Sequence, residues 1–267
     1  MRVLHINAFD QFGGAARAAY RLHTGLQKIG VESRMFVGDK RGSDDSVSSY
    51  EPPTDPLNRI RREIRRRWLA RSLNGYRVTA PAGLRNFSDD RTIYGNDPWR
   101  RLPDHDVIHL HWVVGFVDYS DFFLSQVPRK TPIVWTLHDM NPFTGGCHYD
   151  EDCGKFTAAC GACPQLTSKD ENDLSYQVWQ RKRKAVAMIS PHRLHIVADS
   201  NWLASEAKRS SAFAGLPVTA IHYGLDVDTF APRDRLAARS VLGIPPDARV
   251  VLFGADHLGV QRKGFAF

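Results

Sequence analysis

Short apolar runs rich in β-branched residues alternate with helical patterns along most of the chain. Near-continuous apolar runs are typical of parallel strands covered on both faces, so six of them predict buried strands. These runs are residues 2–7, 33–37, 106–112, 132–138, 194–199 and 218–222. Between the first two, a glycine turn precedes alanines and leucines at helical spacing, and Gly30 is a natural stop for that helix. This order of elements predicts an α/β fold with a doubly wound parallel sheet and flanking helices.

The later part of the chain predicts the end of one domain and the beginning of another. Ser200 is a good N-cap for a helix from Asn201 to about Ser210. A proline-bearing connector over residues 224–232 resembles an interdomain linker. The pattern then predicts a helix over 235–242 and a buried strand over 249–254.

We therefore divide the chain into a first domain (1–223), a linker (224–248) and the beginning of a second domain (249–267). A strand needs neighbours with which to pair, and the roughly 40 residues after the connector are too few for an independent core. We expect the chain to be a fragment of a longer protein.

A basic segment over residues 57–73 predicts an amphipathic helix. Four apolar residues lie one helical turn apart and share a face: Leu57, Ile60, Ile64 and Trp68. The rest of the surface is filled by arginines, which are Arg59, Arg61, Arg62, Arg65, Arg66, Arg67 and Arg71. Such a helix either covers the sheet with a solvated outer face or rests on an anionic membrane, as basic amphipathic helices do. Contact with RNA or DNA is a third alternative.

Composition and charge narrow the class of protein. With 42% hydrophobic residues among 267, the chain is too apolar to be disordered. No run approaches the roughly 18 apolar residues of a membrane-spanning helix, and His5 and Asn7 interrupt the first apolar run, unlike a signal peptide. We therefore expect a cytoplasmic protein. A net charge of +7 favours anionic partners such as nucleotide phosphates, anionic lipids or nucleic acid.

The glycine turn after the first strand is a candidate anion site. Its sequence, Phe12-Gly13-Gly14-Ala15-Ala16-Arg17, lacks the third glycine of a dinucleotide fingerprint, which disfavours a nicotinamide or flavin oxidoreductase. Two glycines at a helix start let backbone N–H groups approach an anionic ligand. A tight turn without a ligand is the alternative.

All four cysteines of the chain fall in one stretch of loop composition, residues 141–166. They are Cys147, Cys153, Cys160 and Cys163. Four thiols at this spacing can complete a tetrahedral structural zinc site, which leaves no open position for catalysis. Disulfides, which a reducing cytoplasm disfavours, redox chemistry and inert thiols are the alternatives. His148 is a candidate substitute ligand.

Histidines stand where two predicted strands end. Ligand sites of open α/β sheets form at the carboxyl ends of strands, which makes His138 and Asp139 candidates for substrate contact. His109 and His111 end another strand, on either side of Leu110. For His109 the simpler interpretation is a hydrogen-bonded structural residue.

Taken together, these segments resemble the family 4 glycosyltransferases, which are retaining enzymes of the GT-B fold. The resemblance is greatest to the branch that builds bacterial exopolysaccharide and lipopolysaccharide sugars, and it extends along essentially the whole chain. It rests on residues 13–17, 106–112, 136–149, 160–166, 200–204, 221–230 and 250–265. The cysteine loop beside the His-Asp strand end is the most specific of these segments.

The resemblance implies two facing Rossmann-like domains with the active site between them. The chain would supply the N-terminal half of this GT-B fold, which is the acceptor-side domain, and the start of the donor-binding domain. The first helical turn would meet the donor diphosphate or the acceptor through Gly13, Gly14, Ala15 and Arg17.

The same resemblance implies roles for four further residues. His138 would face the donor sugar near the reacting carbon, with Asp139 beside it. Lys263, with Arg262 beside it, would pair with the diphosphate of the leaving nucleotide, whose charge a cation stabilises. The family's paired glutamates would lie beyond Phe267, so we expect the chain to lack the full donor site.

The resulting hypothesis is a retaining hexosyltransferase of cell-surface polysaccharide synthesis. It would move a hexose from a nucleotide-sugar donor to a glycan or lipid-linked acceptor, without a catalytic metal, at or near the inner face of the plasma membrane. The first alternative is a non-catalytic acceptor-binding domain that works with a partner chain. The second is a zinc-stapled nucleic-acid module. The arginines lie far in sequence from the cysteine loop, so we expect no nucleic-acid partner.

Overall fold

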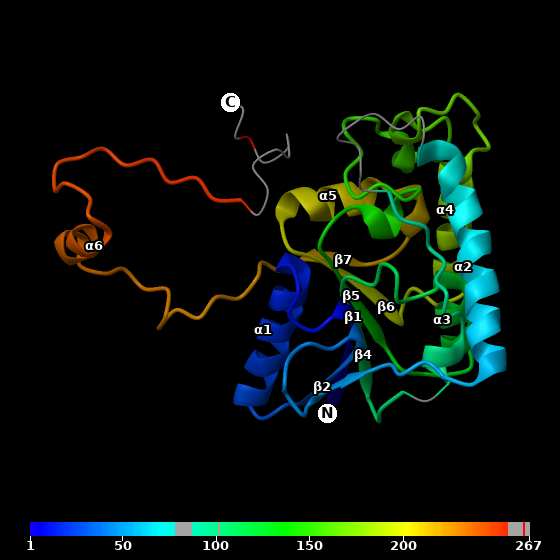
Figure 1. Ribbon diagram of the computed structural model, residues 1–267, viewed down its shortest axis with the longest axis horizontal. Coiled ribbons are helices and arrows are strands. Elements are labelled where there is room, and N and C mark those ends of the chain that lie inside the picture. Colours follow the sequence, from blue (N-terminus) through cyan, green and yellow to red (C-terminus); the bar gives the residue numbers. More distant parts are fainter. Residues whose placement is uncertain (78–86, 101, 256–263, 265–267) are drawn as a thin grey trace. The chain divides into compact units, whose positions relative to one another are not determined.

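The computed structural model describes residues 1–77, 87–100, 102–255 and 264. The chain divides into two units, Met1–Gly224 and Leu225–Phe267. The first unit is built on a seven-stranded sheet of order β3-β2-β1-β4-β5-β6-β7, in which every neighbouring pair is parallel (Figure 1). The strands are β1 (Arg2–Phe9), β2 (Glu32–Asp39), β3 (Val47–Ser49), β4 (Val107–Leu110), β5 (Ile133–Leu137), β6 (Leu194–Ala198) and β7 (Val218–Ala220).

Helices flank this sheet (Figure 1). They are α1 (Gly14–Lys28), α2 (Pro56–Arg77), α3 (Tyr119–Gln126), α4 (Leu174–Val186) and α5 (Asn201–Arg209). The helix α1 packs on β1 and β2, α5 packs on β6 and β7, and α3 packs on α4. Gly30 follows α1 with a positive φ of 81°, and the Ser200 side chain caps α5 by accepting a hydrogen bond from the Leu203 N–H. Both predicted helix signals are thus confirmed.

The central strands are buried on both sides. Leu4 and Ile6 of β1, Ile108 of β4 and Trp135 of β5 have no exposed surface. A strand covered on both faces needs apolar residues at nearly every position, which is why these runs could be predicted from sequence. The predicted fold class, an α/β Rossmann-like parallel sheet with flanking helices, is confirmed.

The structure corrects some of the predicted elements. Residues 249–254 form no strand, and Val251 and Leu252 are 96% and 93% exposed. The second unit, as far as it is described, contains no strand that could complete the backbone hydrogen bonds of this run, which a strand requires. Two helices, α3 and α4, were not predicted, and the short strand β3 lies in a stretch that has the polar composition of a loop.

The second unit contains α6 (Arg235–Leu242), which agrees with the predicted helix. The Asp234 side chain caps it by accepting a hydrogen bond from the Ala237 N–H. The assignment of residues 224–248 to a linker and 249–267 to a donor-binding domain stays a prediction.

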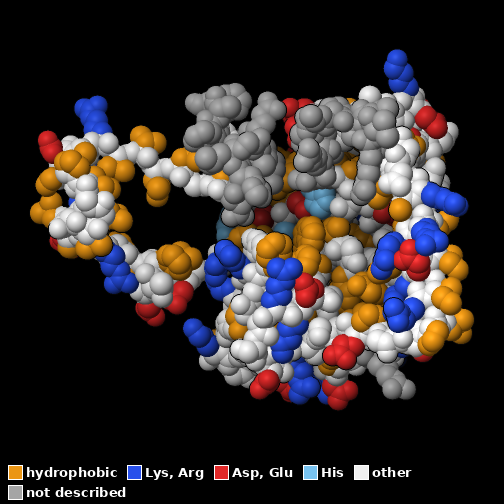
Figure 2. Space-filling view, in the orientation of Figure 1, with side chains coloured by type: hydrophobic (Ala, Val, Ile, Leu, Met, Phe, Trp, Pro, Cys, Tyr) orange, Lys and Arg blue, Asp and Glu red, His pale blue; other side chains and the backbone are white. Residues whose placement is uncertain are grey.

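The helix α2 turns its apolar stripe outward. The stripe residues are between 50% and 67% exposed and comprise Leu57, Ile60, Ile64 and Trp68. On the other side of the helix, Arg65 donates hydrogen bonds to the Thr92 carbonyl and to the buried Asp118 carboxylate, the latter at 2.7 Å. Hydrophobic side chains and Lys and Arg side chains therefore lie together along the edge formed by α2 (Figure 2). None of the described helices has the length and apolar character needed to cross a membrane.

Candidate functional site

The candidate site lies at the carboxyl edge of the sheet, where the strand order reverses. Chain order runs outward from β1 through β2 to β3 on one side and from β4 onward on the other. Doubly wound sheets bind ligands outside this switch point, between β1 and β4. The two strand ends are joined here by aromatic stacking, since the rings of Phe9 and Trp112 have centroids 6.1 Å apart.

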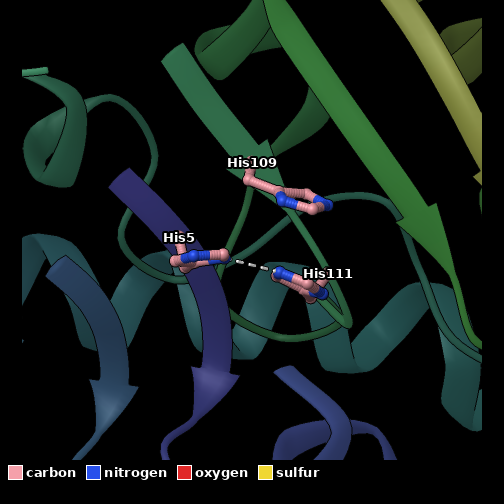
Figure 3. Close-up of side chains that lie close together, drawn as sticks. All are labelled: His5, His109 and His111. Atoms are coloured by element: carbon pink, nitrogen blue, oxygen red, sulfur yellow. Dashed lines mark hydrogen bonds between the residues drawn. The ribbon is translucent and has the colours of Figure 1, made fainter. Parts of the chain in front are cut away.

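Three histidines from three neighbouring strands form a hydrogen-bonded series, which we call the histidine chain: His5 within β1, His111 after β4 and His138 after β5. His5 Nδ1 lies 2.9 Å from His111 Nε2, and His111 Nδ1 lies 3.4 Å from His138 Nε2. His138 Nδ1 pairs with the Tyr223 hydroxyl at 2.5 Å. Because a neutral imidazole has one donor and one acceptor nitrogen, the tautomer of one ring sets the tautomers of the others. Figure 3 shows the link between His5 and His111.

These imidazoles are neutral near pH 7. Burial lowers the pKa of His138 to about 4, although the charges of Asp139 and Asp199 act in the opposite direction. Burial also holds the pKa of His5 and of His111 well below the usual value, and neighbouring histidines add to the effect. The His138 ring keeps part of its surface exposed, so a ligand can reach it. At neutral pH it would meet that ligand as a hydrogen-bonding group and not as a cation.

His109 lies beside the histidine chain (Figure 3). One nitrogen each of His5, His109 and His111 lies within 4.8 Å of the others, and this is the one such group of three potential metal ligands among the described residues. The His109 ring stacks on His111 with centroids 4.2 Å apart, and its Nε2 bonds with Thr136 Oγ1 at 2.7 Å. One nitrogen of each ring pairs with another ring or with a hydroxyl, so we interpret the group as a hydrogen-bonded network, in which the buried His5 Nε2 has no partner among the described residues.

Asp139 anchors the loop that follows β5. Its Oδ2 accepts a hydrogen bond from Trp112 Nε1 at 3.1 Å and pairs with His148 Nδ1 at 2.5 Å, while Oδ1 accepts from the Asn141 backbone N–H at 2.9 Å. Burial alone would raise the pKa of this carboxyl, but these hydrogen bonds bring it below its usual value. The carboxylate therefore ties the ends of β4 and β5 to the loop.

The glycine turn opens α1 at the same edge of the sheet. Gly13 is the N-cap and has a positive φ of 86°, and no side chain caps the helix. A Cβ atom on Gly13 or Gly14 would meet no atom of the described residues within 4 Å, so these residues leave the space in front of the turn open. The first turn also contains Ala15 and the exposed Arg17, and no acidic residue. Its N–H groups and positive dipole end suit an anion.

The cysteine loop continues from Asp139. The Asn141 side-chain amide donates to the Gly146 carbonyl at 2.8 Å, and the Met140 N–H donates to the His148 carbonyl at 3.0 Å. His148 Nε2 bonds with the Ser88 hydroxyl at 2.9 Å, so both nitrogens of that ring are engaged. His148 is therefore a poor substitute for a cysteine ligand.

Sequence reasoning did not place His5 or Tyr223 in the site. In the sequence His5 is only an interruption of an apolar run, and its position beside His109 depends on the register of β1 with β4. Tyr223 lies 85 residues from His138 along the chain. No local signal connects either pair. The predicted Arg262 and Lys263 lie outside the described residues.

A doubly wound sheet with polar and aromatic groups at its switch point defines a Rossmann-like ligand-binding domain. The model of Glycosyltransferase Family 4 matches residues 12–229 of this chain. That match covers most of the chain, which therefore belongs to glycosyltransferase family 4.

Curated relatives share parts of this sequence. A protein named "Putative colanic acid biosynthesis glycosyl transferase WcaC", of Escherichia coli (strain K12), is 28% identical over 171 residues, which are 63% of this chain and 40% of the relative. D-inositol 3-phosphate glycosyltransferases of Mycobacterium bovis (strain BCG / Pasteur 1173P2) and Mycobacterium tuberculosis (strain ATCC 25177 / H37Ra) are each 53% identical over 153 residues, 56% of this chain and 26% of the relative. The chain thus covers less than half the length of these relatives.

Proposed function

We propose that the protein containing this chain is a retaining glycosyltransferase that moves a hexose from a nucleotide-sugar donor to a glycan or lipid-linked acceptor. The family match over residues 12–229 carries this proposal. A role in cell-surface polysaccharide synthesis is supported by the relative named for colanic acid biosynthesis. The first unit would be the acceptor-side domain, and its carboxyl edge would form one wall of the active site.

The opening of α1 would stabilise the leaving group. Departure of a nucleoside diphosphate concentrates negative charge, and backbone N–H groups aimed at that charge lower the barrier. Gly13 and Gly14 leave such N–H groups uncovered, and Arg17 adds a positive charge one turn further along. The open space at the turn is the observation that supports this assignment.

His138 would contact the donor sugar near the reacting carbon. A neutral ring places no second positive charge beside a developing oxocarbenium ion, and a hydrogen bond to a sugar hydroxyl would replace the long 3.4 Å contact of His138 Nε2 with His111. The bond to Tyr223 then keeps the orientation of the ring. Asp139 would act as a positioning residue, since Trp112 and His148 already occupy its Oδ2.

The complete gene product is the material for the test. Release of nucleoside diphosphate would be measured with a panel of nucleotide hexoses, and the anomeric configuration of the product would be read by NMR. We expect His138→Ala to lower kcat about 100-fold or more with the fold intact. His192→Ala removes an exposed histidine next to the amino end of β6 and serves as the matched control. Wild-type turnover in His138→Ala would remove His138 from the mechanism.

The helix α2 would hold the enzyme against anionic lipid. Its exposed apolar stripe stands among arginines, which is the combination that binds at the interface of an anionic bilayer. Within the part of the chain that the structure describes, Arg66 and Arg67 form ion pairs with Glu63 of the same helix and keep more than half of their side-chain surface exposed. Positive charge is therefore available at this face.

Co-sedimentation with vesicles tests the membrane contact. We expect binding to vesicles that contain phosphatidylglycerol and none to purely zwitterionic vesicles. The double variant Ile60→Ser/Ile64→Ser should lose this binding, whereas Leu124→Ser, which removes an exposed leucine of α3, should keep it. Equal binding to both vesicle types, or none to either, would contradict the proposal.

A further inference from the structure

The cysteines come together in space as they do in sequence. We call them the cysteine cluster: Cys147, Cys153, Cys160 and Cys163. All four line a single cavity enclosed by the loop that follows β5 (green in Figure 1). All four are free thiols, and each is at most partly exposed. Four reduced sulfurs around one cavity, in a chain with no other cysteine, form an unusual concentration of soft ligands.

The backbone around the cluster is held in an unfavourable conformation. Among the described residues, every non-glycine residue with positive φ lies in or directly after this loop: Glu151, Asp152, Ala162 and Thr167. Gly161 adds a φ of 148°, and a Cβ there would lie 2.3 Å from the Glu171 carbonyl oxygen. Strain of this kind persists only where the surrounding structure imposes it. The two residues between Cys160 and Cys163 are thus both held in a tight turn.

A hydrogen-bond donor and a buried ammonium lie near the sulfurs. The Gly145 backbone N–H donates to Cys160 Sγ at 3.1 Å, while burial raises the pKa of the Cys160 and Cys163 thiols, so their protons leave as the metal binds. Lys182 is fully buried, and its ammonium acts on the sulfurs of Cys147 and Cys160. Hydrogen-bond donors around sulfur ligands are the usual outer shell of a metal–thiolate site.

We propose that the cysteine cluster binds one zinc ion as a structural site. Four thiols would lose their protons to solvent, and four thiolates with one Zn²⁺ carry a net charge of −2, part of which the buried Lys182 offsets. The closed set of four sulfurs leaves no coordination position for substrate. The ion is therefore a staple and not a catalyst.

Metal binding also tightens the loop. In a filled tetrahedral site neighbouring sulfurs are roughly 3.8 Å apart, from a Zn–S distance of about 2.3 Å. No three of the cysteine sulfurs already lie within 4.8 Å of one another, so the ion would draw them together. The loop carries His148, which holds Asp139, and the staple therefore fixes the loop next to the end of β5.

Metal analysis of the intact protein, purified under reducing conditions without added metal, tests the proposal. We expect about one zinc per chain and no reaction of the cysteines with a thiol reagent until a strong chelator removes the metal. Replacement by Co²⁺ should give thiolate-to-cobalt charge-transfer absorption and the visible bands of a tetrahedral site. These measurements use the wild-type chain, so they do not depend on the folding of a variant.

Variants then identify the ligands. Cys160→Ser/Cys163→Ser should lose the zinc, and Lys169→Ala, which changes an exposed residue of the same region, should retain it. Four freely reacting thiols in metal-free wild-type protein, or two disulfides by mass spectrometry, would overturn the proposal. Full zinc content in the double cysteine variant would overturn it as well.

The zinc proposal stands apart from the proposed glycosyl transfer. It rests on the loop alone, and its readouts are metal content, thiol reactivity and absorption. If the protein contains zinc but is inactive on every nucleotide sugar, the zinc proposal holds and the proposed function fails. If the enzyme is active but contains no zinc, only the zinc proposal fails.

Discussion

His109→Gln probes the free energy stored in the buried imidazoles. Burial lowers the pKa of His109 to about 3, against 6.5 in an unfolded chain. Between these values the unfolded state binds a proton that the folded state refuses, so the free energy of unfolding falls as the pH falls below about 6.5. At about pH 5 the loss due to this one histidine is at most about 2 kcal/mol, since its ring keeps some exposure. Glutamine does not titrate and can keep the bond to Thr136.

Comparison of the variant with wild type isolates this contribution. Asp90 acts with the opposite sign, because burial raises the pKa of its carboxyl to about 6 and its protonation favours the folded state on acidification. That effect is present in both proteins and cancels. The histidine chain lowers stability in acid in both proteins, but His109 is one of the neighbours that lower the pKa of His5 and of His111, so its replacement also eases this loss, in the same direction as its own effect.

The assay is urea unfolding followed by tryptophan fluorescence at about pH 7.5 and about pH 5. The drop in the free energy of unfolding between the two pH values should be smaller in His109→Gln than in wild type, by up to about 2 kcal/mol. His192→Gln, which replaces an exposed histidine, should show the wild-type drop. An unchanged drop in His109→Gln would refute the argument that the folded protein keeps this ring neutral.

Three further substitutions test the packing of the first unit. Trp99→Ala should cost about 3–5 kcal/mol in urea unfolding, because the buried indole packs edge-on against Phe122, and a cost below about 1 kcal/mol would contradict this. Asp118→Ala should lower the free energy of unfolding by about 2 kcal/mol, because the carboxylate caps α3 and accepts a hydrogen bond from Arg65. Thermal unfolding would be followed by circular dichroism, and a wild-type melting temperature would contradict this expectation. Gly161→Ala should cost about 1–3 kcal/mol and speed proteolysis of the cysteine loop, since its Cβ would meet a backbone oxygen; equal proteolysis would count against the strained turn.

The sheet could be predicted because its signals are local. Buried parallel strands need apolar residues at nearly every position, and this pattern is visible in β1, β4, β5 and β6 without any knowledge of neighbours. The helices α3 and α4 lack such a clear pattern. The first has only eight residues, and the buried Lys182 interrupts the apolar face of the second.

Two outcomes depended on neighbours that a sequence pattern does not contain. The apolar run 249–254 has the composition of a strand but lies exposed, since a strand exists only where another strand accepts its hydrogen bonds. The sequence pattern predicted the apolar face of α2, but it could not predict whether that face turns toward the sheet or toward solvent. In the structure a different face turns inward, on which Arg65 reaches a buried carboxylate and Leu73 and Tyr76 pack against buried apolar residues.

The candidate site also combines features that the sequence predicts with contacts that only the fold creates. From the sequence alone came the strand-end position of His138 and Asp139, the glycine turn and the cysteine loop, because each occupies a few consecutive residues. The union of His5, His111, His138 and Tyr223 into one hydrogen-bonded series was decided by the register of β1, β4 and β5 and by the return of the chain after β7. Register is set by how whole faces of side chains pack, and a shift of one residue would turn His5 away from His109. Groups of neighbouring residues could therefore be predicted from the sequence, whereas contacts between distant residues are decided by the fold.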